Sequence, residues 1–457
     1  MVRNMNIDFN KRRNYYKILL LVFVCLGISK VSFGQKKWSL QDCINFAYEN
    51  NISVKKAQLD VETAEVDLFK SKMDILPSLS GSASHNYNWG RFIDPTTNQF
   101  NTQMTQTDNI NFQSSLPIIS GFTRINSIKQ NKLDRDAAKF SVEAAKNMLA
   151  LEITSNFLQV LYNQELSKAS EAQVEKSKQQ VEKTEKLVEA GTVAQGDLLN
   201  VKSQLAEEES KLISYKNQTY TYLVALQQAL DLPIDPKFEI EIPALNIEIS
   251  ENVLKNPEDV YTKAVKIMPE ILGAELNFKS SVKGVQIAKG ALYPSLSFGA
   301  NISTNYSDRS NPNVPLQSFG KQLEDNIAEA AGFALRIPIF NNYMARTQLN
   351  KAKIGKERSS YNLETAKLNL RKDIESAYTE ALNAWRSYKS AEASLYYYQE
   401  AFKYTEQKYQ VGLVSSYDYN IAKTNLTGAE SGLIRAKYTY IFKTKVLDFY
   451  LGNPLTL

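Results

Sequence analysis

The side chains that most often carry catalytic chemistry are scarce in this chain of 457 residues. His85 is its only histidine, and Cys25 and Cys43 are its only cysteines. His85 would need a partner histidine to form a metal site, and Cys43 would need a histidine base to act as a nucleophile. Because the sequence offers neither, we expect no enzymatic activity, no metal site and no cofactor.

Two aspartates remain as candidate functional groups, because each stands at the same place after a glycine. Asp197 follows Gly191 at the same spacing at which Asp418 follows Gly412. Both fall about one and a half turns into a predicted helix. An aspartate near a helix N-terminus caps free backbone N–H groups or offsets the helix dipole, a contribution of roughly 0.5–2 kcal/mol. We expect this structural role for Asp197, whereas the role of Asp418 stays open at this point.

The N-terminus has the pattern of a secretory signal peptide. Four basic residues at 11–17 precede an apolar run at 18–28, and the small residues Ser32 and Gly34 stand at the −3 and −1 positions of a cut before Gln35. The run is well short of the roughly 20 apolar residues of a membrane-spanning helix. We therefore predict that residues 1–34 are a signal peptide and not an anchor.

Removal of the signal changes the charge balance and the cysteine count. It holds six of the 54 basic and one of the 49 acidic residues, which leaves 48 of each. A balanced mature chain has no global basic field, and nucleic acid is not an expected partner. Only Cys43 survives processing, so no intrachain disulfide forms. A helical secreted chain without disulfides must gain stability from helix packing or from oligomerisation.

The mature chain is a tandem duplication. Pro77 and Pro294 open matching Pro-Ser-Leu-Ser segments, and Pro117 recurs as Pro338. The segment 186–205 aligns with 407–426. Three landmarks in the same order and at nearly constant spacing indicate one duplicated structural module, far longer than a solenoid repeat. We predict a first repeat at 35–230, a linker at 231–256 and a second repeat at 257–457.

Each repeat changes its hydrophobic period twice. Apolar residues recur at helical spacing over 42–73, and the period becomes two after the proline, which is typical of a strand. The alternating segments predict β-hairpins at about 78–117 and 295–338, with polar loops at about 93–108 and 308–325. The helical period then returns. The segments 124–190 and 346–411 contain no proline, and each predicts a helix on the order of 100 Å long. These helices end in turns near Gly191 and Gly412.

Strands that alternate apolar and small polar residues suit a wall between lipid and water, but a soluble sheet packed on one face alternates as well. Four strands cannot close a barrel, and an open sheet edge cannot lie in lipid. Either the strands are outside a membrane, or several chains share one barrel. Two chains would give eight strands and three would give twelve, and the residues alone do not choose between them.

The chain resembles the TolC-like outer-membrane efflux protein family over nearly all of its mature length. The resemblance rests on the duplicated module, the strand entries at Pro77 and Pro294, the strand exits at Pro117 and Pro338, and two Gly-x-Val-x-x-x-Asp turns. It implies a mainly α chain with a small transmembrane β part. Three chains would complete a 12-stranded barrel in the outer membrane and a helical tunnel across the periplasm. Such a homotrimer is the exit duct of tripartite efflux pumps or type I secretion systems, with a periplasmic adaptor and an inner-membrane transporter as partners and outer-membrane lipid around its barrel.

The resemblance also assigns a place to the two turns. It puts both at the periplasmic entrance of the tunnel, where the adaptor docks. The implied adaptor contacts are Gly191, Thr192, Val193, Gly412, Leu413, Val414 and Ser415. The glycines are needed for the helix–turn–helix whether or not anything docks. Asp418 and Asp197 would form a carboxylate ring that narrows the entrance, but Ile421 occupies the next turn after Asp418, which argues against a second acidic tier.

A second function class shares the signal peptide and the helices. A periplasmic scaffold or adaptor built from coiled-coil hairpins would lack a pore, but it has no reason to carry two matched strand hairpins between its helices. We therefore favour a channel in the outer membrane that extends into the periplasm. The sequence does not identify the exported substrate, because an inner-membrane pump would select it.

Overall fold

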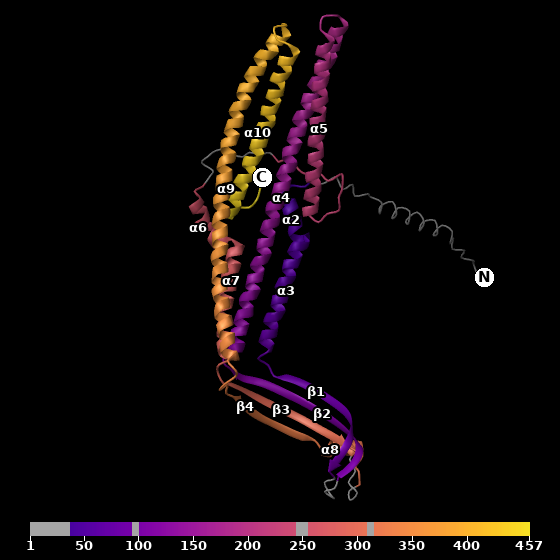
Figure 1. Ribbon diagram of the computed structural model, residues 1–457, viewed down its shortest axis with the longest axis vertical. Coiled ribbons are helices and arrows are strands. Elements are labelled where there is room, and N and C mark those ends of the chain that lie inside the picture. Colours follow the sequence, from indigo (N-terminus) through magenta and orange to yellow (C-terminus); the bar gives the residue numbers. More distant parts are fainter. Residues whose placement is uncertain (1–36, 94–99, 244–254, 309–314) are drawn as a thin grey trace, which may run out of the picture.

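The computed structural model describes residues 37–93, 100–243, 255–308 and 315–457. The predicted signal peptide, residues 1–34, lies outside them, as do residues 244–254 of the predicted linker. Figure 1 shows a curved sheet at one end of an elongated molecule and two helical hairpin tips at the other. Between them run long helices that account for most of the described chain. The predicted mainly α fold with a small β part is confirmed.

The long helices of the two repeats match in length. Helices α4 (Thr123–Glu189) and α9 (Met344–Gln410) have 67 residues each, and α5 (Gln195–Ala229) and α10 (Ser416–Tyr450) have 35 each. At about 1.5 Å per residue, α4 and α9 are each on the order of 100 Å long. Both helices of the second repeat begin at the same offset from their counterparts. Among the described residues, no helix is both long and apolar enough to cross a membrane.

The predicted helix at 42–73 is wrong in one respect, because it is broken in two. Helix α2 (Leu40–Asn50) ends at Asn51, whose extended backbone starts α3 (Ile52–Met73). The Asn51 side chain caps α3 at the N–H of Ser53 and donates to the carbonyl of Ala229. The amphipathic pattern runs through this break, because one capping residue redirects the helix without changing which positions are apolar.

The second repeat breaks its helix at the same place by a different means. Helix α6 (Pro257–Ile267) is followed by extended Met268 and then by α7 (Pro269–Gly290), which matches α3 in length and in its place in the repeat. A proline disfavours the helical conformation in the residue before it. Pro269 therefore enforces at Met268 the break that the side chain of Asn51 produces in the first repeat. Helices α3 and α7 lie beside the halves of α4 and α9 that are nearer to the sheet (Figure 1).

The four strands form one antiparallel sheet in the order β1-β2-β3-β4. They are β1 (Ser78–Ile93), β2 (Phe100–Ser120), β3 (Ser295–Ser307) and β4 (Ala328–Arg336). The predicted loops are too wide: β2 already begins at Phe100, and a short helix, α8 (Phe319–Asp325), lies within the second loop. β2 also passes Pro117, where the register with β3 shifts by a bulge, since proline cannot donate to the ladder.

One face of this sheet is apolar and largely exposed among the described residues, although α8 packs on one end of it, where the rings of Tyr306 and Phe319 lie 5.0 Å apart. Phe112 pairs with Ile302 across β2 and β3, and the rings of Phe298 and Phe333 lie 5.2 Å apart across β3 and β4. Phe333 is 71 % exposed, and all nine residues of β4 are exposed. β1 and β4 are edge strands, each with one edge that no other described strand of this chain covers.

The hydrophobic core lies at the middle of the helical part. Its largest buried side chains come from both repeats and include Phe157 of α4, Leu226 of α5, Ile271 of α7, Ile374 of α9 and Ile441 of α10. The segment after α5 joins this core. The backbone of Trp38 pairs there with Glu239 and Glu241 at 3.0 and 2.9 Å. This core fixes the two helical hairpins relative to each other, and their tips extend from it.

Candidate functional site at the helical tips

Helices α4 and α5 form the first helical hairpin, α9 and α10 form the second, and both turn in the same way. We call residues 187–198 the first tip and residues 408–419 the second tip. Gly191 and Gly412 adopt the left-handed conformation with φ of 71° and 74°. Their N–H groups bond to the carbonyls of Val188 and Tyr409 at 2.9 and 3.1 Å, and the N–H of the next residue bonds one residue further back in each helix. This is a Schellman cap, which explains the glycine at both turns.

Asp418 belongs to a capping box at the start of α10. Its backbone N–H donates to Oγ of Ser415 at 3.1 Å, and the backbone N–H of Ser415 donates to the Asp418 carboxylate at 3.4 Å. Together these contacts satisfy backbone donors that a helix start leaves free. The carboxylate also stays exposed at the tip. The structure therefore places Asp418 in a cap and keeps its charge on the surface.

Asp197 makes a different contact from the one expected. It is in the first turn of α5, but the residue before that helix is Ala194, which has no capping side chain. The Asp197 carboxylate instead accepts a hydrogen bond from the hydroxyl of Ser416, the first residue of α10. Ser416 is only 5 % exposed. This contact joins the first tip to the second. The two matched aspartates therefore differ in role: Asp418 caps its own helix, and Asp197 links the two tips.

Two tyrosines of the second hairpin lie beside this link. The rings of Tyr409 and Tyr419 are stacked with centroids 4.6 Å apart. Burial raises the pKa of Tyr409, and the charge of Asp197 raises it further. Burial, with a smaller effect of Glu406, raises the pKa of Tyr419 to about 12. Both phenols are therefore neutral at physiological pH, and the negative charges at the tips belong to carboxylates.

The outer surfaces of the two tips differ. In the second tip Leu413 is 74 % exposed and Tyr417 is exposed as well. The corresponding residues of the first tip are Thr192 and Gly196, and the Thr192 hydroxyl bonds back to the carbonyl of Leu187 at 2.9 Å. Val193 and Val414 are half-buried beneath the turns. The first tip is thus small and polar, and the second is apolar and aromatic.

The other residues singled out from the sequence lie far from the tips. Cys43 is buried in the core. His85 on β1 pairs across the strands with Asp108 of β2, with Nδ1 and Oδ1 2.5 Å apart. Within the described ranges, no group of three or more His, Cys, Asp or Glu side chains is arranged to hold a metal ion.

Sequence reasoning missed the partner of Asp197. Ser415-Ser416 stands where the first repeat has Ala194-Gln195, so the two copies diverge at the N-terminus of α10. That divergence was a usable signal. The repeat alignment drew attention to residues that match, whereas this link depends on a residue that does not.

Comparison with known proteins extends these observations to a family. The model of the outer membrane efflux protein family matches residues 43–231 and 260–453, once in each repeat. The outer membrane protein TolC of Escherichia coli strain K12 is 23 % identical over 447 residues, which cover 96 % of this chain and 87 % of TolC. The cation efflux system protein CusC of Escherichia coli O157:H7 is 23 % identical over 417 residues, covering 86 % of this chain and 82 % of CusC.

Solved structures agree on the fold. The crystal structure of the outer membrane protein VceC from Vibrio cholerae superposes with a TM-score of 0.76 at 16 % identity, over 91 % of this chain and 96 % of that chain. The Campylobacter jejuni CmeC outer membrane channel superposes with a TM-score of 0.73 at 19 % identity, over 92 % and 87 % of the two chains. Duplicated helical hairpins, a four-stranded sheet and a family match in both repeats lead to one conclusion: this chain belongs to the outer membrane efflux protein family, whose members are channels of the outer membrane that extend into the periplasm.

Proposed function

We propose that three copies of this chain assemble into one export duct, with the sheets forming a shared 12-stranded barrel in the outer membrane. The observation that carries this proposal is the four-stranded sheet, which has two edges that no described strand covers and a largely exposed apolar face. Unpaired backbone groups and an open edge are costly in lipid, and pairing β1 of one copy with β4 of the next removes every edge. The apolar face then contacts outer-membrane lipid.

The tips form the periplasmic entrance of this duct and the contact for an adaptor that connects it to an inner-membrane transporter. Their distance from the sheet supports this placement, because helices of about 100 Å carry them well beyond a bilayer. The second tip, with Leu413 highly exposed, offers apolar area for the adaptor. Gly191, Thr192 and Val193 of the first tip, and Gly412, Val414 and Ser415 beside Leu413, complete the contact.

Asp418 and Asp197 have separate roles at this entrance. Three exposed Asp418 carboxylates, one from each protomer, concentrate cations there, since clustered charge of one sign attracts its counterions. Asp197 holds the entrance narrow, because its bond to Ser416 ties the two hairpins of a protomer together at the outermost point. The link is a single hydrogen bond from a hydroxyl to a carboxylate, so a docking partner can replace it.

The channel is tested with the mature protein in a planar lipid bilayer. Stepwise conductance is the expected result, and a detergent-soluble outer-membrane protein without any conductance would overturn the proposal. A soluble periplasmic protein would instead favour the coiled-coil scaffold.

The docking surface is tested in cells with a photo-reactive amino acid at Leu413. We expect a cross-link to an inner-membrane-anchored periplasmic adaptor, and no such cross-link from Tyr396, a control site that is 61 % exposed within α9. Equal yields from the two sites would refute a specific contact at the tip.

A further inference from the structure

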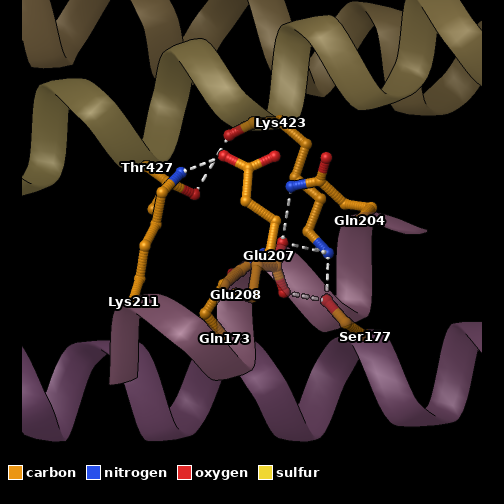
Figure 2. Close-up of polar contacts among 8 residues, drawn as sticks. All are labelled: Gln173, Ser177, Gln204, Glu207, Glu208, Lys211, Lys423 and Thr427. Carbon is orange, nitrogen blue, oxygen red and sulfur yellow. Dashed lines mark hydrogen bonds and ion pairs between the residues drawn. The ribbon is translucent and has the colours of Figure 1, made fainter. Parts of the chain in front are cut away.

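A buried ion pair joins the two helical hairpins part of the way down from their tips. Lys423 of α10 reaches Glu208 of α5, with Nζ 3.3 Å from Oε1, and its ammonium donates to the hydroxyl of Ser177 on α4 at 2.5 Å. The three residues are 8 %, 4 % and 1 % exposed. Figure 2 shows these side chains converging between the helices. We call this set the Lys423 contact.

Glu208 is held by more than the lysine. Its Oε1 also accepts hydrogen bonds from the side-chain amides of Gln173 at 3.3 Å and Gln204 at 3.1 Å. Its other oxygen accepts from the Ser177 hydroxyl (Figure 2). A buried charge is tolerated only when it is paired and fully hydrogen-bonded. The first hairpin therefore presents a prepared carboxylate, and the second hairpin supplies the matching cation.

The contact is not a by-product of the duplication. The counterpart of Lys423 is Lys202, which pairs with Glu185 of its own hairpin at 2.7 Å and is 48 % exposed at its side chain. The same alignment places Tyr398 opposite Ser177 and Ala429 opposite Glu208, so the second repeat has no equivalent acceptor. Of these two matched lysines, Lys423 reaches the other hairpin and Lys202 stays within its own, so the contact is specific to the second repeat.

The Lys423 contact differs in kind from the link at the tips. Burial lowers the pKa of Lys423, and the charge of Glu208 opposes that effect. Separating the pair in place would leave two uncompensated charges among buried side chains, which is strongly unfavourable. The link between Asp197 and Ser416 lies at the tip and involves one charge and a neutral hydroxyl. The tip link is therefore the one that opens more readily.

Further contacts between α4 and α10 lie on the core side of the Lys423 contact, away from the tips. Lys437 lies 3.4 Å from Glu165, and Arg435 donates to the Tyr162 hydroxyl at 3.2 Å. We infer that the Lys423 contact is a pivot: when the tips rearrange, the parts of the hairpins beyond Lys423 move, and the parts on the core side stay docked. This inference rests on the proposed function only in that the tips rearrange at the entrance.

The pivot is tested by distances between spin labels in the mature trimer, diluted with unlabelled protein so that each labelled trimer carries one labelled protomer. One pair reports the tips (Thr192→Cys with Leu413→Cys). The other reports the core side of the pivot, at the exposed positions Lys168 and Thr439. Asp197→Ala then releases the tip link. We expect the tip distances to lengthen and broaden, while the distances between Lys168 and Thr439 stay unchanged.

Lys423→Met in the released background should broaden the distances on the core side as well. Lys202→Met, its exposed counterpart, should leave them unchanged. Glu208→Gln, which keeps the hydrogen-bonding shape without the charge, guards against a folding defect in the first variant. The inference is overturned if the core-side distances already change with Asp197→Ala alone, or if neither Lys423→Met nor Glu208→Gln alters them.

These outcomes are separate from the test of the channel. If the trimer never conducts, the proposed function fails, but the distances still show whether the hairpins pivot at Lys423. If the trimer conducts and the core-side distances change together with the tips, the channel stands and the pivot does not.

Discussion

The glycine at the second tip allows a prediction whose size follows from the backbone alone. Gly412 has φ of 74°, and a Cβ added there would meet no atom within 4 Å. The substitution Gly412→Ala therefore adds no clash and costs only the left-handed conformation, about 1–2 kcal/mol for an L-residue, less a gain of roughly 0.4–1 kcal/mol from restricting the unfolded chain. We expect a net loss of about 1 kcal/mol for each protomer.

A matched control lies in the helix that follows. A Cβ on Gly428, within α10, would likewise meet nothing within 4 Å, but its backbone is helical. Gly428→Ala should therefore stabilise the protein by roughly 0.5–1 kcal/mol, because alanine is the better helix former. Gly121→Ala should cost more than Gly412→Ala, since its Cβ would overlap the carbonyl oxygen of Gly290.

The assay is urea unfolding of the mature protein in detergent, with the free energy of unfolding compared among the three variants at equal protein concentration. The order expected for stability is Gly428→Ala, wild type, Gly412→Ala, Gly121→Ala. Gly412→Ala and Gly428→Ala shifting stability in the same direction would refute the assignment of Gly412 to a conformational role.

Three further predictions concern the polar groups of the tips. Asp418→Ala should lower stability by about 1 kcal/mol through loss of the capping box and should reduce cation selectivity, measured as reversal potential in a salt gradient; Asp418→Asn separates the two effects because it keeps a capping side chain. Asp197→Ala and Ser416→Ala should each raise conductance, and the double variant should add nothing to either single change; additive effects would contradict the direct link. The raised pKa of Tyr419 makes the folded state hold its proton more tightly than the unfolded chain does, so its contribution to stability is complete below about pH 10 and is lost as pH rises toward about 12. Thermal unfolding from about pH 9 to about pH 12 should show a decline that is smaller in Tyr419→Phe.

The long elements could be predicted because their signal accumulates over many residues. Helices of 67 residues without proline and strands of period two each contain many consistent positions. The duplication also allowed each expectation to be compared with a second copy. The turn at Gly191 was supported by the one at Gly412, and both have the same left-handed conformation.

Features that depend on one side chain were harder to predict. The break at Asn51 leaves the apolar pattern intact, so periodicity passes over it. The beginning of β2 has the polar composition of a loop, but its ladder of backbone bonds to β1 does not depend on apolar side chains. The Lys423 contact joins residues that lie far apart in the chain, and only the packing of α4, α5 and α10 brings them together.

Part of the candidate site was accessible from the sequence and part was not. The capping role was predicted for Asp197 and left open for Asp418, whereas the structure gives the capping box to Asp418 and the link between tips to Asp197. The aspartates match, but Ser415 and Ser416 have no counterparts in the first repeat. Roles that depend on the neighbour across a packed interface cannot be transferred between copies by alignment alone.

The offset between the repeats has a consequence for how such a chain can change in length. Counterparts keep one offset up to the starts of β1 and β3 and a slightly larger one from α4 and α9 onward, so the additional residues of the second copy fall within its strand hairpin. One residue inserted in a helix rotates everything beyond it by about 100° and would misplace every contact up to the tip. The length difference between the two repeats thus lies at the sheet end of the molecule. A peptide tag placed between β3 and β4 should leave the helix contacts in place, whereas the same tag in α9 would shift them out of register.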